Sequence, residues 1–208
     1  MKTKIFKVSA VTPAVFKETA AALKNGAVII LPTETVYGIS SAADNPAAVE
    51  KMCVIKQKPL NVPLQYLAAG VESAKKFAVF SPAAAALAAK FWPGGVTIVL
   101  PPTEAGKKVA RGFDTVGMRV PANDFTLKLL QTYDGVFAAS SANIHGKPPA
   151  NTEEEILAQF DGVADYIFLD GVPRGTPSTV FQPEPFKIFR PGAVSETEIL
   201  EVLKNVNI

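Results

Sequence analysis

The segment spanning residues 27–31, AVIIL, constrains the fold more than any other part of this sequence. No polar residue interrupts it and Pro32 follows it, which is typical of a strand covered by helices on both faces. The residues before it predict a helix, which Thr12 and Pro13 begin and Gly26 ends. A helix followed by a doubly buried strand favours an α/β architecture.

Helix and strand signals continue to alternate along the chain. Helices are predicted over residues 46–55, 82–91, 125–131, 152–160 and 195–205. Strands are predicted over residues 35–39, 96–100, 118–120, 136–139, 166–169, 178–181 and 187–189. Residues 104–114 form a polar stretch with no predicted element. Because no repeat or linker interrupts the alternation, we expect one α/β domain over residues 1–208, with a twisted mixed sheet flanked by helices.

The composition fits a folded domain with a sizeable core. The chain has 208 residues, of which 48% are hydrophobic, and its 21 Lys and Arg against 19 Asp and Glu give a net charge of +2. Disordered and fibrous classes are excluded. No apolar run approaches the roughly 18 residues of a membrane span, and the N-terminus lacks the apolar region of a secretory signal, so a cytoplasmic protein without membrane contact is expected.

The common nucleotide and metal motifs are missing from the sequence. It contains no G-x-x-x-x-G-K-[ST], no G-x-G-x-x-G, no H-E-x-x-H and no C-x-x-C. A site for ATP must therefore be assembled from scattered basic and hydroxyl side chains. The basic, proline-bearing loop over residues 56–63 is positioned to contribute to such a site.

Four segments place polar residues directly at the ends of apolar strands, where α/β sheets form their ligand crevices. They are LPTETVYG at residues 31–38, GMRVP at 117–121, AASSAN at 138–143 and PSTV at 177–180. Taken singly, each is also explained by hydroxyl groups that satisfy neighbouring backbone groups in a turn. Their combination is more informative than any one of them.

These segments occur in order with IKQKPLNVPL, FWPGGVTIVL, DTVGMRVP and a late RPGAV. From about residue 10 to the C-terminus, the chain thereby resembles the bacterial and archaeal threonylcarbamoyl-AMP synthases, a family of the Sua5/YciO/YrdC type. The resemblance implies a concave YrdC-like or RibB-like architecture with a positively lined cavity. It also implies the short form of the family, a single catalytic domain over residues 1–208 without the appended C-terminal domain of longer members.

The same resemblance implies a reaction and its partners. L-threonine, bicarbonate and ATP would become threonylcarbamoyl-adenylate and pyrophosphate, with Mg²⁺ accompanying the triphosphate and no metal held by the protein. A tRNA threonylcarbamoyltransferase complex would use the adenylate to make N6-threonylcarbamoyladenosine (t6A) beside the anticodon. Weak binding of double-stranded RNA or tRNA belongs to the same expectation.

Two sets of residues match the positions that this family uses. For the threonine end, Arg119 offers a bidentate fork to a carboxylate, and Thr33 and Ser178 offer hydroxyl groups. The catalytic cations for the triphosphate and for the charge developing at the α-phosphorus are Lys56, Lys58 and Arg190. ATP-binding residues include Lys58 and Arg190 together with Thr115, Ala139, Ser141 and Asn143. No general base is required for the attack on ATP, because a carbamate is already an anion.

The sequence departs from the family pattern in the loop over residues 56–63. Lys58 stands where the family usually has arginine, and an ammonium group lacks the planar fork of a guanidinium. Val62 replaces an asparagine, and Leu67 stands where some members have histidine. These changes keep a second hypothesis open, a nucleotide-binding or double-stranded-RNA-binding paralogue of the same fold without synthase activity.

Three isolated residues have simpler explanations. The single cysteine, Cys53, forms neither a disulfide nor a zinc cage and is expected in the core. The single histidine, His145, is expected to be a solvated loop residue, because no G-x-S-x-G elbow accompanies Ser141. Trp92 is expected to anchor the turn before the strand over residues 96–100, with adenine stacking as the minor alternative.

Overall fold

The computed structural model describes residues 2–150, 152–173 and 175–206. The strands in this part of the chain are β1 (Lys4–Lys7), β2 (Val28–Leu31), β3 (Gly38–Ala42), β4 (Gln65–Leu67), β5 (Val96–Leu100), β6 (Val116–Arg119), β7 (Phe137–Ser141), β8 (Tyr166–Leu169), β9 (Thr179–Pro183) and β10 (Phe186–Arg190). The helices are α1 (Pro13–Lys24), α2 (Pro46–Lys56), α3 (Val71–Lys75), α4 (Pro82–Phe91), α5 (Glu104–Val109), α6 (Asp124–Tyr133), α7 (Glu153–Phe160) and α8 (Glu196–Lys204). Of the predicted domain, Met1, Asn151, Arg174 and residues 207–208 lie outside the described residues.

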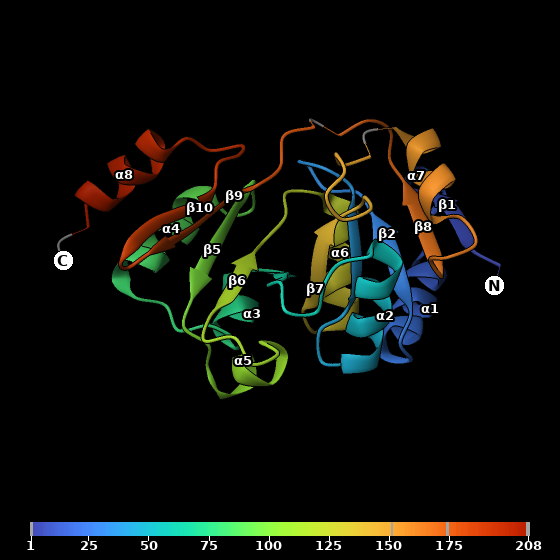
Figure 1. Ribbon diagram of the computed structural model, residues 1–208, viewed down its shortest axis with the longest axis horizontal. Coiled ribbons are helices and arrows are strands. Elements are labelled where there is room, and N and C mark those ends of the chain that lie inside the picture. Colours follow the sequence, from blue (N-terminus) through green and yellow to red (C-terminus); the bar gives the residue numbers. More distant parts are fainter. Residues whose placement is uncertain (1, 151, 174, 207–208) are drawn as a thin grey trace.

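The strands form one mixed sheet in the order β1-β8-β2-β3-β7-β4-β6-β5-β9-β10. The sheet combines parallel pairs, such as β2 with β8 and β4 with β6, with antiparallel pairs, such as β2 with β3 and β5 with β6. Figure 1 shows α1, α2, α6 and α7 around one half of the sheet, and α3, α4, α5 and α8 around the other. The mixed α/β sheet predicted from the sequence is therefore confirmed.

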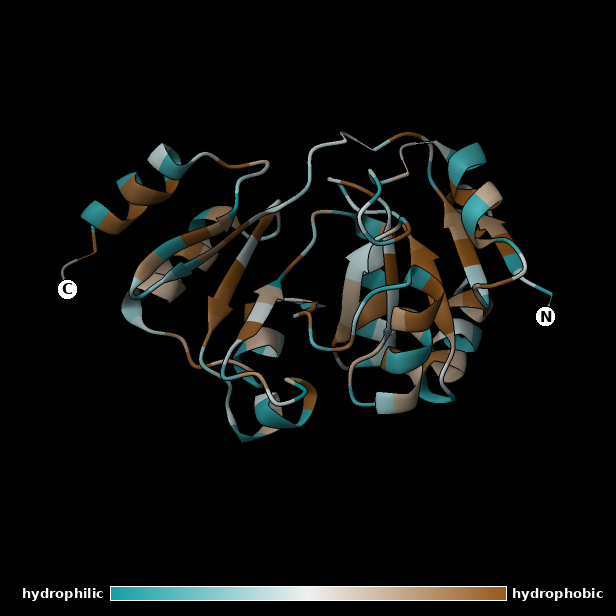
Figure 2. Ribbon diagram, in the orientation of Figure 1, coloured by the Kyte–Doolittle hydropathy of each residue, from teal (hydrophilic) through white to brown (hydrophobic). Residues whose placement is uncertain are grey.

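The two faces of β2 pack into different parts of the core, as the uninterrupted apolar run predicts. Val28 and Ile30 belong to one buried cluster, which includes Met52 of α2. Ile29 and Leu31 point the other way, into the cluster that α1 and α6 cover. Figure 2 shows the apolar residues concentrated on the strands, with hydrophilic residues on the outer sides of the helices.

Local side-chain caps start several helices where the sequence indicates, although Thr12 at the start of α1 makes no side-chain capping bond. Asn45 accepts a hydrogen bond from the Ala48 N–H at 3.1 Å at the start of α2, and Ser81 accepts one from Ala84 at 3.2 Å at the start of α4. A reciprocal capping box begins α7 and another begins α8. Within the described residues, no helix is both long enough and apolar enough to cross a bilayer.

The polar stretch over residues 104–114 contains a helix that the sequence pattern does not predict. Helix α5 begins after Thr103, whose hydroxyl accepts from the Gly106 N–H at 3.1 Å. Position 106 inside this helix must be glycine, because a Cβ there would lie 1.9 Å from the Phe77 carbonyl oxygen. Since glycine lowers helix propensity, tertiary packing against the segment after α3 decides this element.

Other short elements also differ from the sequence prediction. Strand β1 pairs with β8 at one edge, and β4 and α3 are only 3 and 5 residues long, too short for a clear periodic signal. Strand β3 begins at Gly38, not at Thr35, because the Thr33 hydroxyl bonds to the Val36 carbonyl at 2.6 Å and forms a turn. The PTET segment is consequently a loop between β2 and β3.

Candidate functional site

A cavity of about 280 Å³ lies between β4, β5, β6 and β7 and the loop over residues 56–63. Most of the side chains predicted to bind the nucleotide line it, although they come from distant parts of the sequence. They are Lys58, Thr115, Ala139, Ser141 and Arg190. The remaining predicted residue, Asn143, is not among the described lining residues. The structure therefore brings five of these six residues to one cavity.

Positive charge gathers on one side of this cavity. Burial lowers the pKa of the Lys58 ammonium, and the nearby charges of Arg111 and Arg190 lower it further. Burial also lowers the pKa of Arg190, as does the charge of Arg119. No carboxylate is found among the described residues that line the cavity. Like charges held close together without an anion favour a ligand with several negative charges, such as a triphosphate.

The RPGAV segment fixes Arg190 against Ser178. The Arg190 guanidinium donates from Nε and Nη2 to the Ser178 carbonyl oxygen, at 3.1 and 2.7 Å, and from Nη2 to the Ser178 hydroxyl at 2.9 Å. At Gly192 a Cβ would lie 2.3 Å from the Pro177 carbonyl oxygen, so only glycine allows this close approach. The Ala193 N–H donates to the same oxygen at 2.9 Å. The close approach that Gly192 allows thus positions the Arg190 guanidinium at the cavity wall.

Lys56 lies in a different place from its predicted partner Lys58. Its side chain is buried, with 3% of the residue exposed, and Nζ donates to the Ser141 carbonyl at 2.6 Å and to the Asn143 carbonyl and side-chain oxygens at 2.9 and 2.7 Å. Burial lowers the pKa of Lys56 to about 8, and the charge of Lys58 contributes. The structure therefore does not bring Lys56 to the cavity lining. It makes Lys56 the support of the SSAN loop.

The SSAN loop is held as a unit by these contacts. The Ser141 hydroxyl donates to Asn143 Oδ1 at 2.6 Å, and Asn143 Nδ2 donates to the Ile144 and Lys147 carbonyl oxygens at 2.8 and 2.5 Å. Asn143 thereby uses both ends of its amide within the protein. Asn143 therefore organises the loop, and Ser141 lines the cavity.

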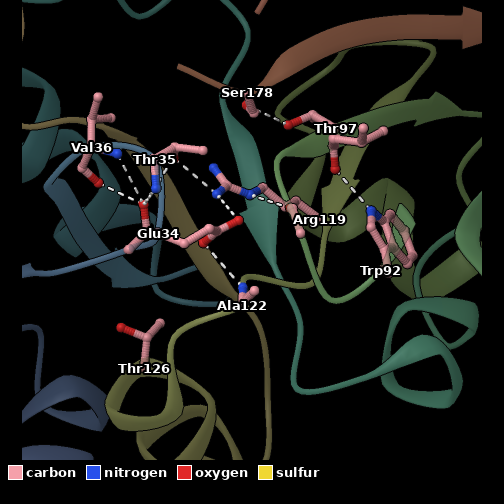
Figure 3. Close-up of polar contacts among 12 residues, drawn as sticks. Glu34, Thr35, Val36, Trp92, Thr97, Arg119, Ala122, Thr126 and Ser178 are labelled. Atoms are coloured by element: carbon pink, nitrogen blue, oxygen red, sulfur yellow. Dashed lines mark hydrogen bonds and ion pairs between the residues drawn. The ribbon is translucent and has the colours of Figure 1, made fainter. Parts of the chain in front are cut away.

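The three residues predicted for the threonine end are all buried. Ser178 lies behind the cavity wall, where its hydroxyl is 3.0 Å from that of the lining residue Thr97. The Thr33 hydroxyl is 2.9 Å from that of Thr35, which in turn accepts from Arg119 Nη2 at 2.9 Å. Figure 3 shows the Arg119 guanidinium pointing toward Thr35 and Glu34, with Thr97 and Ser178 in contact beyond it. Arg119 and Thr33 are thus connected through Thr35.

Arg119 has a carboxylate partner that the sequence analysis did not assign. Its Nη2 lies 2.7 Å from Glu34 Oε1 (Figure 3). Its Nε donates to the Gly94 carbonyl at 3.0 Å. Burial lowers the pKa of the guanidinium, and the neighbouring Glu34 carboxylate acts against this. The glutamate inside PTETVYG was the available signal, because an acid beside a buried arginine is a common way to balance its charge.

Sequence reasoning also missed several residues of the cavity wall. Gln65 and Thr97 interrupt otherwise apolar strands and contact each other, with the Thr97 hydroxyl donating to Gln65 Oε1 at 3.1 Å. Phe113 and Phe189 add apolar rings. A polar residue within a buried strand such as VTIVL was a usable signal, whereas the aromatic residues carried none.

The isolated residues behave as the sequence indicates. Cys53 is buried, His145 is exposed, and the Trp92 indole N–H donates to the Val96 carbonyl at 2.8 Å across the turn before β5. Within the described ranges, no group of at least three His, Cys, Asp or Glu side chains could hold a metal ion. Trp92 packs in the core, away from the described cavity lining.

The chain matches known proteins along most of its length. The Sua5/yciO/yrdC family model, described as "Telomere recombination", matches residues 21–192. The threonylcarbamoyl-AMP synthase of Pyrococcus abyssi is 36% identical over 194 residues, which cover 91% of this chain and 57% of that protein. The threonylcarbamoyl-AMP synthase of Bacillus subtilis is 32% identical over 198 residues, which cover 92% of this chain and 57% of that protein.

Solved structures of Sua5 also superpose on this chain over most of its length. A double variant of P. abyssi Sua5 superposes with a TM-score of 0.91 at 33% identity, covering 98% of this chain and 61% of that one. P. abyssi Sua5 complexed with L-threonine gives 0.87 at 32% identity, covering 99% and 61%. The chain thus spans about 57% of the length of the curated relatives it matches, and over that span it belongs to the Sua5/YciO/YrdC family.

Proposed function

We propose that this chain carries the catalytic site of an L-threonylcarbamoyl-adenylate synthase, a nucleotidyltransferase. It would convert L-threonine, bicarbonate and ATP into threonylcarbamoyl-adenylate and pyrophosphate. The observation that carries this proposal is the gathering of Lys58, Thr115, Ser141 and Arg190 around one cavity with no described carboxylate in its wall. Two relatives named threonylcarbamoyl-AMP synthase, and the threonine complex of P. abyssi Sua5, point to the same chemistry.

The reaction needs positioning and positive charge more than acid or base catalysis. The amine of threonine and bicarbonate first condense to the carbamate N-carboxy-threonine, and a water molecule leaves. A carbamate oxygen then forms a bond to the α-phosphorus of ATP. The bond from that phosphorus to the bridging β-phosphate oxygen breaks, and pyrophosphate leaves with the electron pair. Lys58 and Arg190 bind the phosphate oxygens and stabilise the charge that develops there. A Mg²⁺ ion enters with ATP as part of the substrate.

The two ends of the substrate use different parts of the site. Arg119 binds the α-carboxylate of threonine, and the hydroxyl groups of Thr33 and Ser178 contact its polar end. Thr115 and Ser141 hydrogen-bond the nucleotide beside the backbone of Ala139. Lys56 and Asn143 contribute by holding the loop that presents Ser141. The adenylate then passes to a tRNA threonylcarbamoyltransferase complex, with weak RNA binding assisting the transfer.

The decisive experiment is to incubate the chain with radiolabelled bicarbonate, L-threonine and ATP and to separate the products by chromatography. We expect a labelled adenylate, and pyrophosphate release that requires threonine and bicarbonate together. Serine and glycine are the control substrates, because equal use of either would contradict the assignment of Thr33 and Ser178. Absence of labelled adenylate, combined with retained nucleotide or RNA binding, would instead support the paralogue without synthase activity.

A further inference from the structure

At the end of β6, the Glu34 carboxylate is bound by the Arg119 guanidinium and by the Ala122 backbone N–H. Its Oε1 lies 2.7 Å from Arg119 Nη2, and its Oε2 accepts from the Ala122 backbone N–H at 3.0 Å (Figure 3). A guanidinium and a backbone N–H held side by side are the partners that a free carboxylate ligand uses. Glu34 therefore stands in the position of a bound carboxylate.

The donors of Arg119 leave no room for a second bidentate carboxylate while Glu34 is in place. Nη2 donates one hydrogen to Glu34 and the other to the Thr35 hydroxyl, and Nε donates to the Gly94 carbonyl. A two-pronged contact to a carboxylate needs Nη2 together with either Nη1 or Nε. A ligand that binds Arg119 in this way must first take one of the two Nη2 hydrogens now given to Glu34 and Thr35.

Glu34 covers Arg119 from the solvent side. The Arg119 side chain is 2% exposed, whereas that of Glu34 is 16% exposed. Glu34 also lines a separate hollow of about 220 Å³ beside Tyr37. Its carboxylate therefore has space to leave Arg119 without repacking the core. Asp170 lines the same hollow and no described lining residue is a cation, so a displaced Glu34 faces a like charge there and returns to Arg119 when the ligand leaves.

The loop that carries Glu34 does not depend on the Glu34 side chain. The Thr33 hydroxyl bonds to the Val36 carbonyl at 2.6 Å, the Thr126 hydroxyl donates to the Pro32 carbonyl at 2.6 Å, and the Gly175 N–H donates to the Thr35 carbonyl at 2.9 Å. These bonds persist if only the glutamate rotates. Movement of one side chain is thus sufficient to expose the guanidinium.

We propose that Glu34 is an internal carboxylate that closes the amino-acid site, and that the α-carboxylate of threonine enters by exchanging with it on Arg119. The inference rests on the proposed function, because it takes threonine as the ligand. Exchange of one carboxylate for another keeps the buried guanidinium paired throughout, and an unpaired buried charge is unfavourable. Glu34 consequently lowers the apparent affinity for threonine.

The test compares threonine binding to the wild-type chain, Glu34→Gln and Glu34→Asp by calorimetry. Glutamine keeps the shape and loses the charge, and aspartate keeps the charge and loses the reach. Both variants are expected to bind L-threonine roughly three- to tenfold more tightly than the wild type, because the internal competitor is weakened. Without ligand, both should melt at a lower temperature, and threonine should raise their melting temperature by more than it raises that of the wild type.

Two controls separate carboxylate exchange from a general structural effect. L-threonine amide, which lacks the carboxylate, should bind no more tightly to the Glu34 variants than to the wild type. Glu18→Gln removes a glutamate that pairs with Lys4 at the far edge of the sheet, and it should leave threonine binding unchanged. If Glu34→Gln fails to fold, Glu34→Asp decides the question.

The outcomes distinguish the two levels of the proposal. Threonine binding by the wild type, with equal or weaker binding by the Glu34 variants, overturns the exchange and leaves the synthase function standing. An equal gain for threonine amide also overturns the exchange, because the carboxylate would then play no part. Failure of the wild type and of every variant to bind threonine overturns the synthase function and the exchange with it.

Discussion

The Nζ atom of Lys56 lies 2.7 Å from the side-chain oxygen of Asn143 and 2.9 Å from its carbonyl oxygen, across 87 residues of sequence. This contact joins the end of α2 to the loop after β7 and holds Ser141 at the cavity. A lysine that motif comparison assigns to the triphosphate is therefore also a structural support. Its effects on stability and on nucleotide binding are expected to be linked.

Lys56→Met should destabilise the fold and weaken ATP binding together. The substitution removes charged hydrogen bonds and leaves buried carbonyl groups unpaired, for an expected loss of about 2 to 4 kcal/mol in the free energy of unfolding. Urea denaturation measures this. The matched control is Lys51→Met, which removes a half-exposed pair with Asp165 at 2.7 Å and should cost about 0 to 1 kcal/mol. Equal losses in the two variants would contradict the supporting role of Lys56.

The stability contributed by Lys56 should depend on pH in a defined window. Its pKa in the folded chain is about 8, below the ordinary lysine value of 10.5. Between these values the unfolded chain binds more protons, so the Lys56 contribution to the free energy of unfolding rises with pH, by up to about 1.4 kcal/mol per pH unit. Urea denaturation of the wild type and Lys56→Met from pH 7.5 to pH 9.5 should show the difference between them growing. A difference that stays constant or shrinks over this range would argue against a lowered pKa.

Arg119→Lys should raise the KM for threonine more than the KM for ATP. Lysine keeps the charge beside Glu34 but cannot also donate to Gly94 and Thr35 as the guanidinium does. We expect KM for threonine at fixed ATP to rise by about tenfold or more, with KM for ATP changed less than about threefold. Arg190→Lys is the matched comparison and should show the opposite preference. An equal loss for both substrates in Arg119→Lys would place Arg119 in the fold or between the two sites.

Lys58→Ala should weaken ATP binding, and Lys58→Arg should preserve or tighten ATP binding. Lys58 lines the cavity, so its truncation removes a charged contact to phosphate, at an expected cost of about 1.5 to 3 kcal/mol. Arginine restores the residue usual in the family and matches phosphate oxygens with a fork. Isothermal titration with a non-hydrolysable ATP analogue measures both variants. Lys75→Ala, which removes a surface partner of Glu72, is the control and should bind like the parent. Unchanged affinity in Lys58→Ala would remove Lys58 from the phosphate site.

Thr97→Val should damage the threonine end of the site without changing the core volume. The Thr97 hydroxyl contacts both Gln65 Oε1 at 3.1 Å and the Ser178 hydroxyl at 3.0 Å. Valine fills the same space but leaves the buried Ser178 hydroxyl and the partly buried Gln65 amide with one partner fewer, for an expected loss of about 1 to 3 kcal/mol in stability. Steady-state kinetics should show weaker discrimination between threonine and serine. Full retention of this discrimination would show that Ser178 does not depend on Thr97.

The sequence by itself determined the α/β class, the doubly buried strand β2, most of the capped helices and the family. Apolar runs, caps such as Asn45 and Ser81, and the order of the motifs act within a few residues of one another. Such signals do not depend on the rest of the fold, because a cap needs only the next turn of its own helix. For the same reason the motif segments were identifiable before any contact was known.

The tertiary structure alone decided how the site residues pair. Glu34 meets Arg119 across 85 residues of sequence, and Lys56 turns to Asn143 instead of the cavity. Elements as short as β4 and α5 likewise form only where the rest of the fold packs on them. The physical reason is that a charged side chain pairs with the partner that burial leaves within reach, and strand order, not local sequence, sets that reach.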